Sequence, residues 1–434
     1  MPNKTPLTSI QRYIKTESAG GLLLLIATIL ALIVVNSPLQ SLYNDLWHFE
    51  IGIHSDHFTL MQSLIHWIND GFMAIFFFLV GLEIKREILI GELNTVKKAL
   101  LPVFAAVGGM ILPMSIFLLT NKNDDTTSGW GIPMATDIAF SLAVLQLLGK
   151  RVPIGLKIFL TAFAIIDDMG AVLVIALFYT HHVTWTLLMI AFVLLAILYL
   201  LSYLQIHNKY LIFSFGIAIW LIFLKAGIHP TIAGILLAFA IPIRQKVNEF
   251  QFAEKLQSIV KRLTDEQNTN PLPVLTKVQI EVIDDLEEWT SRVQSPLQLL
   301  EHRLHYWIAF VVMPIFAFAN AGISLDSKIS IDTALAFNLA LALMIGKIIG
   351  VFGFTFAAVK LRISSLPENV NFKGIFGVAI LSGLGFTMSL FIANLAFLEN
   401  DVFLNSAKIG IVSGSVVAGI IGYLYLAKVF KHTN

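Results

Sequence analysis

The stretch Ala164-Ile-Ile-Asp-Asp-Met-Gly-Ala171 places two adjacent carboxylates, Asp167 and Asp168, in the middle of a long apolar segment. Apolar residues predominate from 158 to 166 before the pair and from 169 to 178 after it. An ionisable side chain inside a membrane helix is costly and usually marks an ion pathway or a proton relay. If this segment spans a bilayer, the two aspartates are therefore the first candidates for a functional site.

The composition of the whole chain supports a membrane location. Of 434 residues, 57% are hydrophobic and only 13% are charged, and the mean hydropathy is +0.80. Soluble domains have about a quarter charged residues and somewhat under half apolar ones. The net charge of +1, without any basic run, gives no reason to expect a nucleic-acid partner. The absence of cysteine excludes disulfides, thiolate metal sites and cysteine nucleophiles.

Apolar stretches long enough to cross a bilayer recur along the chain. A spanning helix needs about 20 mostly apolar residues, and roughly twelve stretches qualify. They are centred near residues 28, 77, 110, 139, 167, 194, 218, 236, 312, 345, 385 and 416. Most of the 29 lysines and arginines fall on the side of the N-terminus, so both termini are predicted to be cytoplasmic. We expect an all-α polytopic protein forming one transmembrane domain over residues 1–430, with its first apolar stretch retained.

Two segments outside these stretches have recognisable patterns. Residues 45–60 alternate loosely between apolar and polar side chains and contain no lysine or arginine, which indicates an external hairpin or loop. Residues 244–297 form a long polar insertion with apolar residues at near-helical spacing on both sides of Pro271 and Pro273. This pattern predicts cytoplasmic surface helices that connect two membrane halves.

Two interruptions accompany the charged residues at membrane depth, which are Asp137, Asp167, Asp168 and Lys347. Gly131-Ile-Pro-Met-Ala-Thr-Asp137 breaks one apolar stretch, and Ser382-Gly-Leu-Gly-Phe-Thr387 breaks another. Broken helices are tolerated in a bilayer only where they line a cavity or are buried in protein, and a matching pair points to a midplane ion site. The alternatives are that Asp137 caps a helix end and that the glycines serve only packing.

Neighbouring residues on a helix point about 100° apart, so Asp167 and Asp168 cannot serve one ligand equally. One aspartate should face the broken segment with Asp137 and form an oxygen cage suited to a hard cation. The other should face a different helix, where Lys347 is the deeply placed cation able to neutralise it.

Several long strings carry a resemblance to a known family. They are His66-Trp-Ile-Asn-Asp-Gly71, Phe76-Phe-Phe-Leu-Val-Gly-Leu-Glu-Ile-Lys-Arg-Glu87, Ala135-Thr-Asp-Ile-Ala-Phe-Ser141, Ala164-Ile-Ile-Asp-Asp168, Gly227-Ile-His-Pro-Thr-Ile-Ala-Gly234, Phe316-Ala-Phe-Ala-Asn-Ala-Gly322 and Gly346-Lys347. In these strings, over nearly its whole length, the chain resembles the NhaA family of sodium/proton antiporters. The resemblance implies inverted-topology repeats with two broken helices that cross near the midplane, an architecture for which the family is itself an established example.

The resemblance also implies roles for individual residues. Asp168 matches the main ion-binding carboxylate, and Asp167 matches its neighbour, so the two are expected to hold the transported Na⁺ or Li⁺. Lys347 matches the lysine that pairs with Asp167, while Thr136 and Asp137 sit at the crossing and balance the helix-end charges. Residues associated with pH regulation are Glu83, Arg86, Glu87, His229, Glu301, His302 and His305. Interfacial histidines are more often solvated or capping residues than sensors, although His302 and His305 lie one turn apart.

The activity implied is export of Na⁺, and of Li⁺, in exchange for H⁺. The family resemblance implies an electrogenic, pH-regulated, alternating-access antiporter of the bacterial inner membrane. It works in the lipid bilayer without a resident cofactor and is not an enzyme, and its candidate assembly is a homodimer. Burial disfavours the charged form of a carboxyl group, so Na⁺ and H⁺ would compete for the same aspartates.

Three other classes of protein would use some of the same features. An intramembrane aspartyl protease needs two aspartates, but its Gly-x-Gly-Asp string is absent, because Gly383-Leu-Gly385 is followed by Phe386. A passive cation channel would lack the pair of broken helices and the buried lysine. A sodium-coupled symporter would need an organic-substrate site, and no separate cluster of residues demands one.

Overall fold

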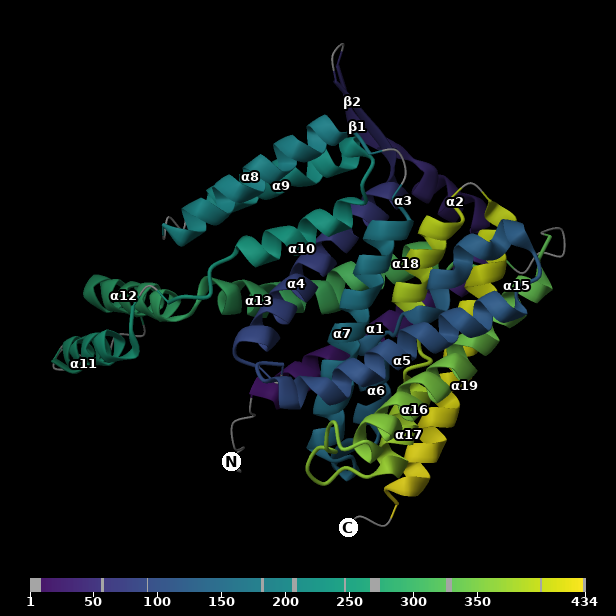
Figure 1. Cartoon of the computed structure of the whole chain (residues 1–434). Coiled ribbons are helices and arrows are strands. Elements are labelled where there is room, and N and C mark those ends of the chain that lie inside the picture. The colour runs from purple at the N-terminus through teal and green to yellow at the C-terminus, as the bar shows by residue number, and fades with distance from the viewer. Residues whose placement is uncertain are drawn as a thin grey trace.

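The computed structural model describes residues 9–431 apart from 56–57, 92, 181–182, 205–208, 246, 266–273, 325–329 and 399. Pro271 and Pro273 of the insertion, and residues 1–8 of the predicted domain, lie outside the described residues. Within the described part, the chain is helical except for one hairpin and short connections (Figure 1).

Helices follow one another along nearly the whole described chain. The first ten α-helices are α1 (Ser9–Val35), α2 (Gln40–His48), α3 (Leu64–His66), α4 (Met73–Leu89), α5 (Val96–Thr120), α6 (Ile138–Leu147), α7 (Ile154–Phe178), α8 (Trp185–Tyr203), α9 (Lys209–Ala226) and α10 (Pro230–Ala240). The others are α11 (Glu249–Asp265), α12 (Lys277–Val293), α13 (Pro296–Trp307), α14 (Met313–Asn320), α15 (Thr333–Leu341), α16 (Lys347–Lys360), α17 (Phe372–Leu381), α18 (Phe386–Ala396) and α19 (Asp401–Val429). Shorter 3₁₀ segments are η2 (Asp124–Met134) and η3 (Gly149–Arg151), and π-helical segments are η1 (Trp67–Phe72), η5 (Ile308–Val312) and η6 (Ala342–Gly346).

Many of these helices are long and apolar enough to cross a membrane. The described residues contain 7 such helices, or up to 10 if each bent pair of helices is counted as one span. A multi-span helical membrane protein, as expected from composition, is therefore confirmed. Two further spans are predicted from hydropathy, but the helices there, α9 and α10, are shorter than a typical span. Helix α9 ends at Ala226, before Gly227 with a φ of 81°, and α10 begins at Pro230.

Three of the spans contain a π-helical turn. The continuous helix Leu64–Leu89 includes η1, Pro296–Asn320 includes η5, and Thr333–Lys360 includes η6. A π turn shifts the faces that the two flanking α-helical parts present, and such turns are frequent at functional sites. Lys347 directly follows η6, so the turn sets the direction in which this buried lysine leaves its helix.

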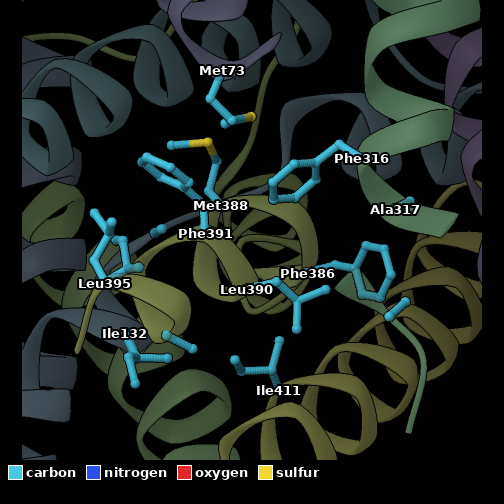
Figure 2. Close-up of a cluster of buried hydrophobic side chains, with 14 of the residues drawn as sticks. Met73, Ile132, Phe316, Ala317, Phe386, Met388, Leu390, Phe391, Leu395 and Ile411 are labelled. Atoms are coloured by element: carbon cyan, nitrogen blue, oxygen red, sulfur yellow. The ribbon is translucent and has the colours of Figure 1, made fainter. Parts of the chain in front are cut away.

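The core of the molecule surrounds α18. Nine of its eleven residues are buried, so this helix is enclosed on all sides, as expected for one that is apolar all round. Figure 2 shows Met73 and Phe316 directed toward Met388 and Phe391 of α18. The ring centroids of Phe77 and Phe391 are 5.7 Å apart. The second predicted break therefore lies at the centre of the protein, away from surrounding lipid.

Two elements project from the helical body. Strands β1 (Glu50–Ser55) and β2 (Phe58–Ser63) form an antiparallel hairpin at the top of Figure 1, in the region expected to be a hairpin or loop. Helices α11 and α12 lie together at the left and occupy much of the insertion. Arg262 donates to Asp285 across this pair at 2.9 Å. The beginning of α1 and the end of α19 lie at the lower end, opposite the hairpin.

Helices α5 and α16 are in backbone contact at glycines. A Cβ atom added at Gly350 would overlap the carbonyl oxygen of Gly108, whereas one added at Gly353 would meet no atom within 4 Å. Both glycines lie on α16, and Gly350 is nearly one turn from Lys347. Glycine is therefore required at position 350 for backbone contact, and this contact sets the position of the buried lysine.

We predict that Gly350→Ala lowers the melting temperature of the purified protein, because overpacking a tight contact costs about 1–3 kcal/mol. Gly353→Ala is the matched control on the same helix and should leave the melting temperature unchanged or raise it slightly. Thermal unfolding in detergent, followed by circular dichroism, measures both. Equal losses in the two variants would show that the α5–α16 approach does not depend on Gly350.

Candidate functional site

The two helix breaks lie against each other. The chain bends by 48° between η2 and α6 and by 42° between α17 and α18. The backbone N–H of Asp137 donates to the carbonyl oxygen of Leu384 at 2.6 Å. The hydroxyl of Thr136 donates to the carbonyl oxygen of Ser382 at 3.1 Å. Each break thus satisfies backbone groups that the other leaves without an intrahelical partner, which is necessary where water is absent.

Further side chains join the two broken helices on either side of this contact. The hydroxyl of Ser141 donates to the carbonyl oxygen of Leu381 at 3.1 Å. The hydroxyl of Ser389 donates to the carbonyl oxygen of Ile132 at 2.8 Å. These bonds fix η2 and α6 to α17 and α18 as one hydrogen-bonded unit.

Asp137 caps the first turns of two helices. Its Oδ1 accepts from the backbone N–H of Phe140 at 3.0 Å, so it is the N-cap of α6. Its Oδ2 accepts from both the backbone N–H and the hydroxyl of Thr387, at 3.1 and 2.5 Å, in the first turn of α18. A carboxylate is favourable at the positive N-terminal end of a helix dipole, and this one lies at two such ends.

Asp167 and Lys347 form a fully buried ion pair. Lys347 Nζ donates to Asp167 Oδ2 at 2.7 Å, and both side chains are 0% exposed. The Nζ atom also lies 5.8 Å from the centroid of the Phe163 ring. Thr136 faces Asp167 with its hydroxyl and backbone amide, which places the pair beside the first break. Two buried charges are costly unless paired, so each residue depends on the other.

Asp168 points to a different side of α7 from Asp167, and it lines a cavity. The cavity has a volume of about 40 Å³, and its acidic lining residues are Asp168, Asp137 and Glu83. Thr387 and Met388 of α18 contribute to the same wall. A single water needs about 10–15 Å³ of such space, so a small cation with water fits the cavity.

Glu83 connects the cavity to a cluster of charged residues near the end of α4. His305 Nδ1 lies 3.9 Å from Glu83 Oε1. Arg86 contacts Glu301 through Nε at 3.3 Å and Glu87 through a terminal nitrogen at 2.8 Å. We call Glu83, Arg86, Glu87, Glu301 and His305 the inner rim. His302 follows Glu301 on α13 and is exposed.

His229 lies apart from the inner rim. Its Nε2 is 2.6 Å from the carbonyl oxygen of Tyr179, at the end of α7. The Tyr179 hydroxyl donates to the carbonyl oxygen of Ser128 at 2.6 Å and accepts from the backbone N–H of Gly131 at 3.2 Å. His229 is therefore linked to the first broken helix through Tyr179, and the seven residues expected to govern pH response do not form one cluster.

Sequence reasoning did not single out Thr387, although the string that contains it was recognised as a break. A threonine after glycine and phenylalanine carries no signal that it will meet an aspartate 250 positions earlier in the chain. Among the described residues, no three His, Asp or Glu side chains lie close enough together to form a metal-binding cluster by themselves. A cation in the cavity at Asp168 would therefore need oxygen ligands besides carboxylates, such as water.

We predict that Thr387→Val lowers the melting temperature, because the bond from the hydroxyl to the buried Asp137 carboxylate is lost while the bond from the backbone N–H remains. A hydrogen bond to a charged group contributes about 1.5–3 kcal/mol. Thr387→Ser retains the hydroxyl and is the matched control. Thermal unfolding of both purified variants in detergent compares them. A serine variant as unstable as the valine variant would show that the methyl group, rather than the hydroxyl, supports this contact.

Similarity to known proteins identifies the family of this chain. A family model described as Na⁺/H⁺ antiporter 1 matches residues 11–426. The chain is 44% identical over 430 residues to the Na⁺/H⁺ antiporter NhaA of Bacteroides fragilis, covering 97% of this chain and 98% of that protein. It is 44% identical over 420 residues to the antiporter NhaA of Helicobacter pylori, covering 96% and 95%. The chain therefore belongs to the NhaA family of Na⁺/H⁺ antiporters, which are membrane transporters and not enzymes.

Proposed function

We propose that this antiporter binds its cation at Asp168, with Asp167 as the second carboxylate of the site, and that Na⁺ and H⁺ compete for them. The observation that carries the proposal is the cavity shared by Asp168, Asp137 and Glu83. Both oxygens of Asp137 already accept hydrogen bonds from α6 and α18. Asp168 is therefore the better candidate for the carboxylate that meets the cation, and Asp137 stabilises the half-helices around it.

The ion pair of Asp167 with Lys347 supplies a second group that can release a proton. In the present arrangement Lys347 Nζ neutralises Asp167. A cation at Asp168 would weaken the hold of Asp167 on the ammonium group, since two positive charges then compete for neighbouring carboxylates. Release of the lysine lets it give up a proton, because the Asp167 carboxylate no longer neutralises its ammonium charge. Loading of one Na⁺ can thus be coupled to loss of more than one H⁺, which makes the exchange electrogenic.

A net charge moved per cycle couples the transporter to the membrane potential. Each elementary charge crossing the bilayer gains about 2.3 kcal/mol per 100 mV. Li⁺ is a second expected cargo, because carboxylate and hydroxyl oxygens bind both small hard cations. Homodimeric assembly stays a prediction.

The proposed function also requires a defined orientation of the protein in the membrane. Seven long apolar helices, three bent pairs and the shorter α9 and α10 would together make the twelve spans expected from the sequence. The beginning of α1 and the end of α19 lie at one end of the molecule and the hairpin at the other (Figure 1). We place the first end, with the inner rim and the polar insertion 244–297, in the cytoplasm of a bacterial cell. The cavity would then receive Na⁺ from the cytoplasmic side past Glu83.

The decisive variant is Asp168→Asn. We expect Na⁺-driven release of H⁺ from proteoliposomes to fall to the level of empty vesicles, because the amide has no negative charge for the cation. Asp45→Asn changes an exposed aspartate on α2 and should retain full exchange. A pH-sensitive dye inside the vesicles measures both variants after addition of Na⁺, Li⁺ or K⁺. Undiminished exchange by Asp168→Asn would overturn the proposed site.

Regulation by the inner rim has a separate test. Glu301→Gln removes a negative charge beside Arg86. Without this negative charge, the remaining titratable groups of the inner rim should lose their protons at lower pH. The pH–activity profile should therefore move toward lower pH. A displacement of about one unit corresponds to an interaction of about 1.4 kcal/mol with one protonation state. Exchange rates measured from pH 6 to pH 9 give the profile. An unmoved profile in the combined Glu301→Gln, His302→Ala and His305→Ala protein would exclude these three residues of α13 as the pH-sensitive element.

A further inference from the structure

Three asparagines from three separate elements form a chain of amide hydrogen bonds. Asn394 Nδ2 of α18 donates to Asn320 Oδ1 of α14 at 2.9 Å, and Asn320 Nδ2 donates to Asn69 Oδ1 of η1 at 2.8 Å. Asn320 also donates to the carbonyl oxygen of Phe316 at 3.0 Å, and Asn394 donates to that of Leu390 at 2.8 Å. Asn320 is 0% exposed. We call these three residues the amide chain.

The amide chain lies between the candidate site and the hairpin end of the molecule. Asn394 follows Thr387 by seven residues on α18, which is about two turns, or about 10 Å. At the other end of the chain, Asn69 belongs to η1, which is tied to the hairpin because Trp67 Nε1 donates to the carbonyl oxygen of Ile51 at 2.8 Å. The cavity at Asp168, in contrast, reaches toward Glu83 and the inner rim.

Apolar side chains fill the space next to the amide chain. Phe391 of α18 lies 5.7 Å from Phe77 and 6.4 Å from Phe316, measured between ring centroids. Met73, one turn after Asn69, is 0% exposed and points into the same cluster (Figure 2). In this conformation, the route from the hairpin end to Asp168 is therefore filled by packed side chains.

The chemistry of the amide chain suits a contact that must open and close. A buried amide is costly unless it is hydrogen-bonded, so the chain favours the packed state in which all three residues have partners. Hydrogen bonds between membrane helices are nevertheless weak on average, and water can replace either partner when the route is wet. An asparagine amide both donates and accepts hydrogen bonds. When the bond between Asn320 and Asn394 breaks, each side chain can therefore form another hydrogen bond, including one to water.

The bond between Asn394 and Asn320 joins two parts of the transporter. Asn394 belongs to the unit that contains both helix breaks, since Thr387 of the same helix holds Asp137. Asn320 belongs to α14. Asn69 belongs to the span Leu64–Leu89, which also carries the inner-rim residue Glu83. In transporters with broken helices, alternating access moves one bundle against another around the ion site. A hydrogen bond across these parts must break each time the site changes sides.

We propose that Asn69, Asn320 and Asn394 form a latch that holds the hairpin-end route to Asp168 shut and dissociates once in each transport cycle. This inference rests on the proposed site at Asp168 and adds positioning residues to it. The latch acts through α18, and none of its three side chains touches the cation. It favours the state in which the site is open to the inner rim, so weakening it shifts the protein toward the opposite state.

The absence of native cysteine permits a direct test with Met73→Cys as the single reactive thiol. A membrane-impermeant maleimide is applied either from the hairpin side or from the opposite side of oriented vesicles. In this background, Asn394→Ala should be labelled about threefold faster from the hairpin side, the shift expected for loss of one average interhelical hydrogen bond. Asn338→Ala is the matched control, because Asn338 Nδ2 also bonds between helices, to the carbonyl oxygen of Thr120 at 3.2 Å.

Two results would overturn the latch. One is equal labelling of the Asn394→Ala and Asn338→Ala proteins from the hairpin side. The other is faster labelling of Asn394→Ala from both sides, which would indicate general loosening of the packing. Because labelling does not require transport, it tests the latch independently of the proposed ion site. Loss of exchange in Asp168→Asn together with no labelling shift in Asn394→Ala would retain the site and reject the latch.

A second experiment keeps the proposal testable if Asn394→Ala folds poorly. Cysteines replace both latch residues in Asn320→Cys/Asn394→Cys, and a short, reducible bifunctional thiol reagent then bridges them. Exchange should stop when bridging is complete and return when the bridge is reduced. Continued Na⁺/H⁺ exchange by fully bridged protein would show that Asn320 and Asn394 need not separate during the cycle.

Discussion

The rest of the structure depends on how two broken helices satisfy their exposed backbone groups without water. A helix end leaves several N–H or carbonyl groups without partners, and in a bilayer each such group is costly. Here the two breaks meet, and Asp137 binds donors in the first turns of both α6 and α18. One carboxylate thereby compensates two helix dipoles. This contact allows irregular backbone to exist in the middle of the protein, next to the proposed ion site.

The same arrangement distributes the buried charges among different tasks. Asp137 is held by fixed hydrogen-bond donors, and Asp167 is held by Lys347 at 2.7 Å. Asp168 is the member of the adjacent pair that lines the cavity. Adjacent positions on α7 differ in direction by about 100°, so one short sequence can supply both an ion pair and a cavity wall. Close approach of α5 and α16 at Gly108 and Gly350 then brings the lysine to its partner.

The two ends of the transporter are built from different chemistry. The inner rim contains charged side chains that contact one another around Arg86, and it continues into the cavity through Glu83. Toward the hairpin, aromatic rings and the amide chain fill the corresponding space. Charged groups tolerate water and ions, whereas packed rings exclude them. This asymmetry supports the proposal that the site at Asp168 opens toward the inner rim in this conformation.

The sequence by itself determined the membrane class, the two breaks and the buried charges, because hydropathy, proline and glycine act locally and a charge in an apolar run is conspicuous. It also narrowed the choice of partner for the aspartate pair to Lys347. Only the tertiary structure decided that Thr387 meets Asp137, that His229 lies away from the inner rim, and that Asn69, Asn320 and Asn394 join. These contacts link positions far apart in the chain, and a lone threonine or asparagine has no local pattern that reveals its partner.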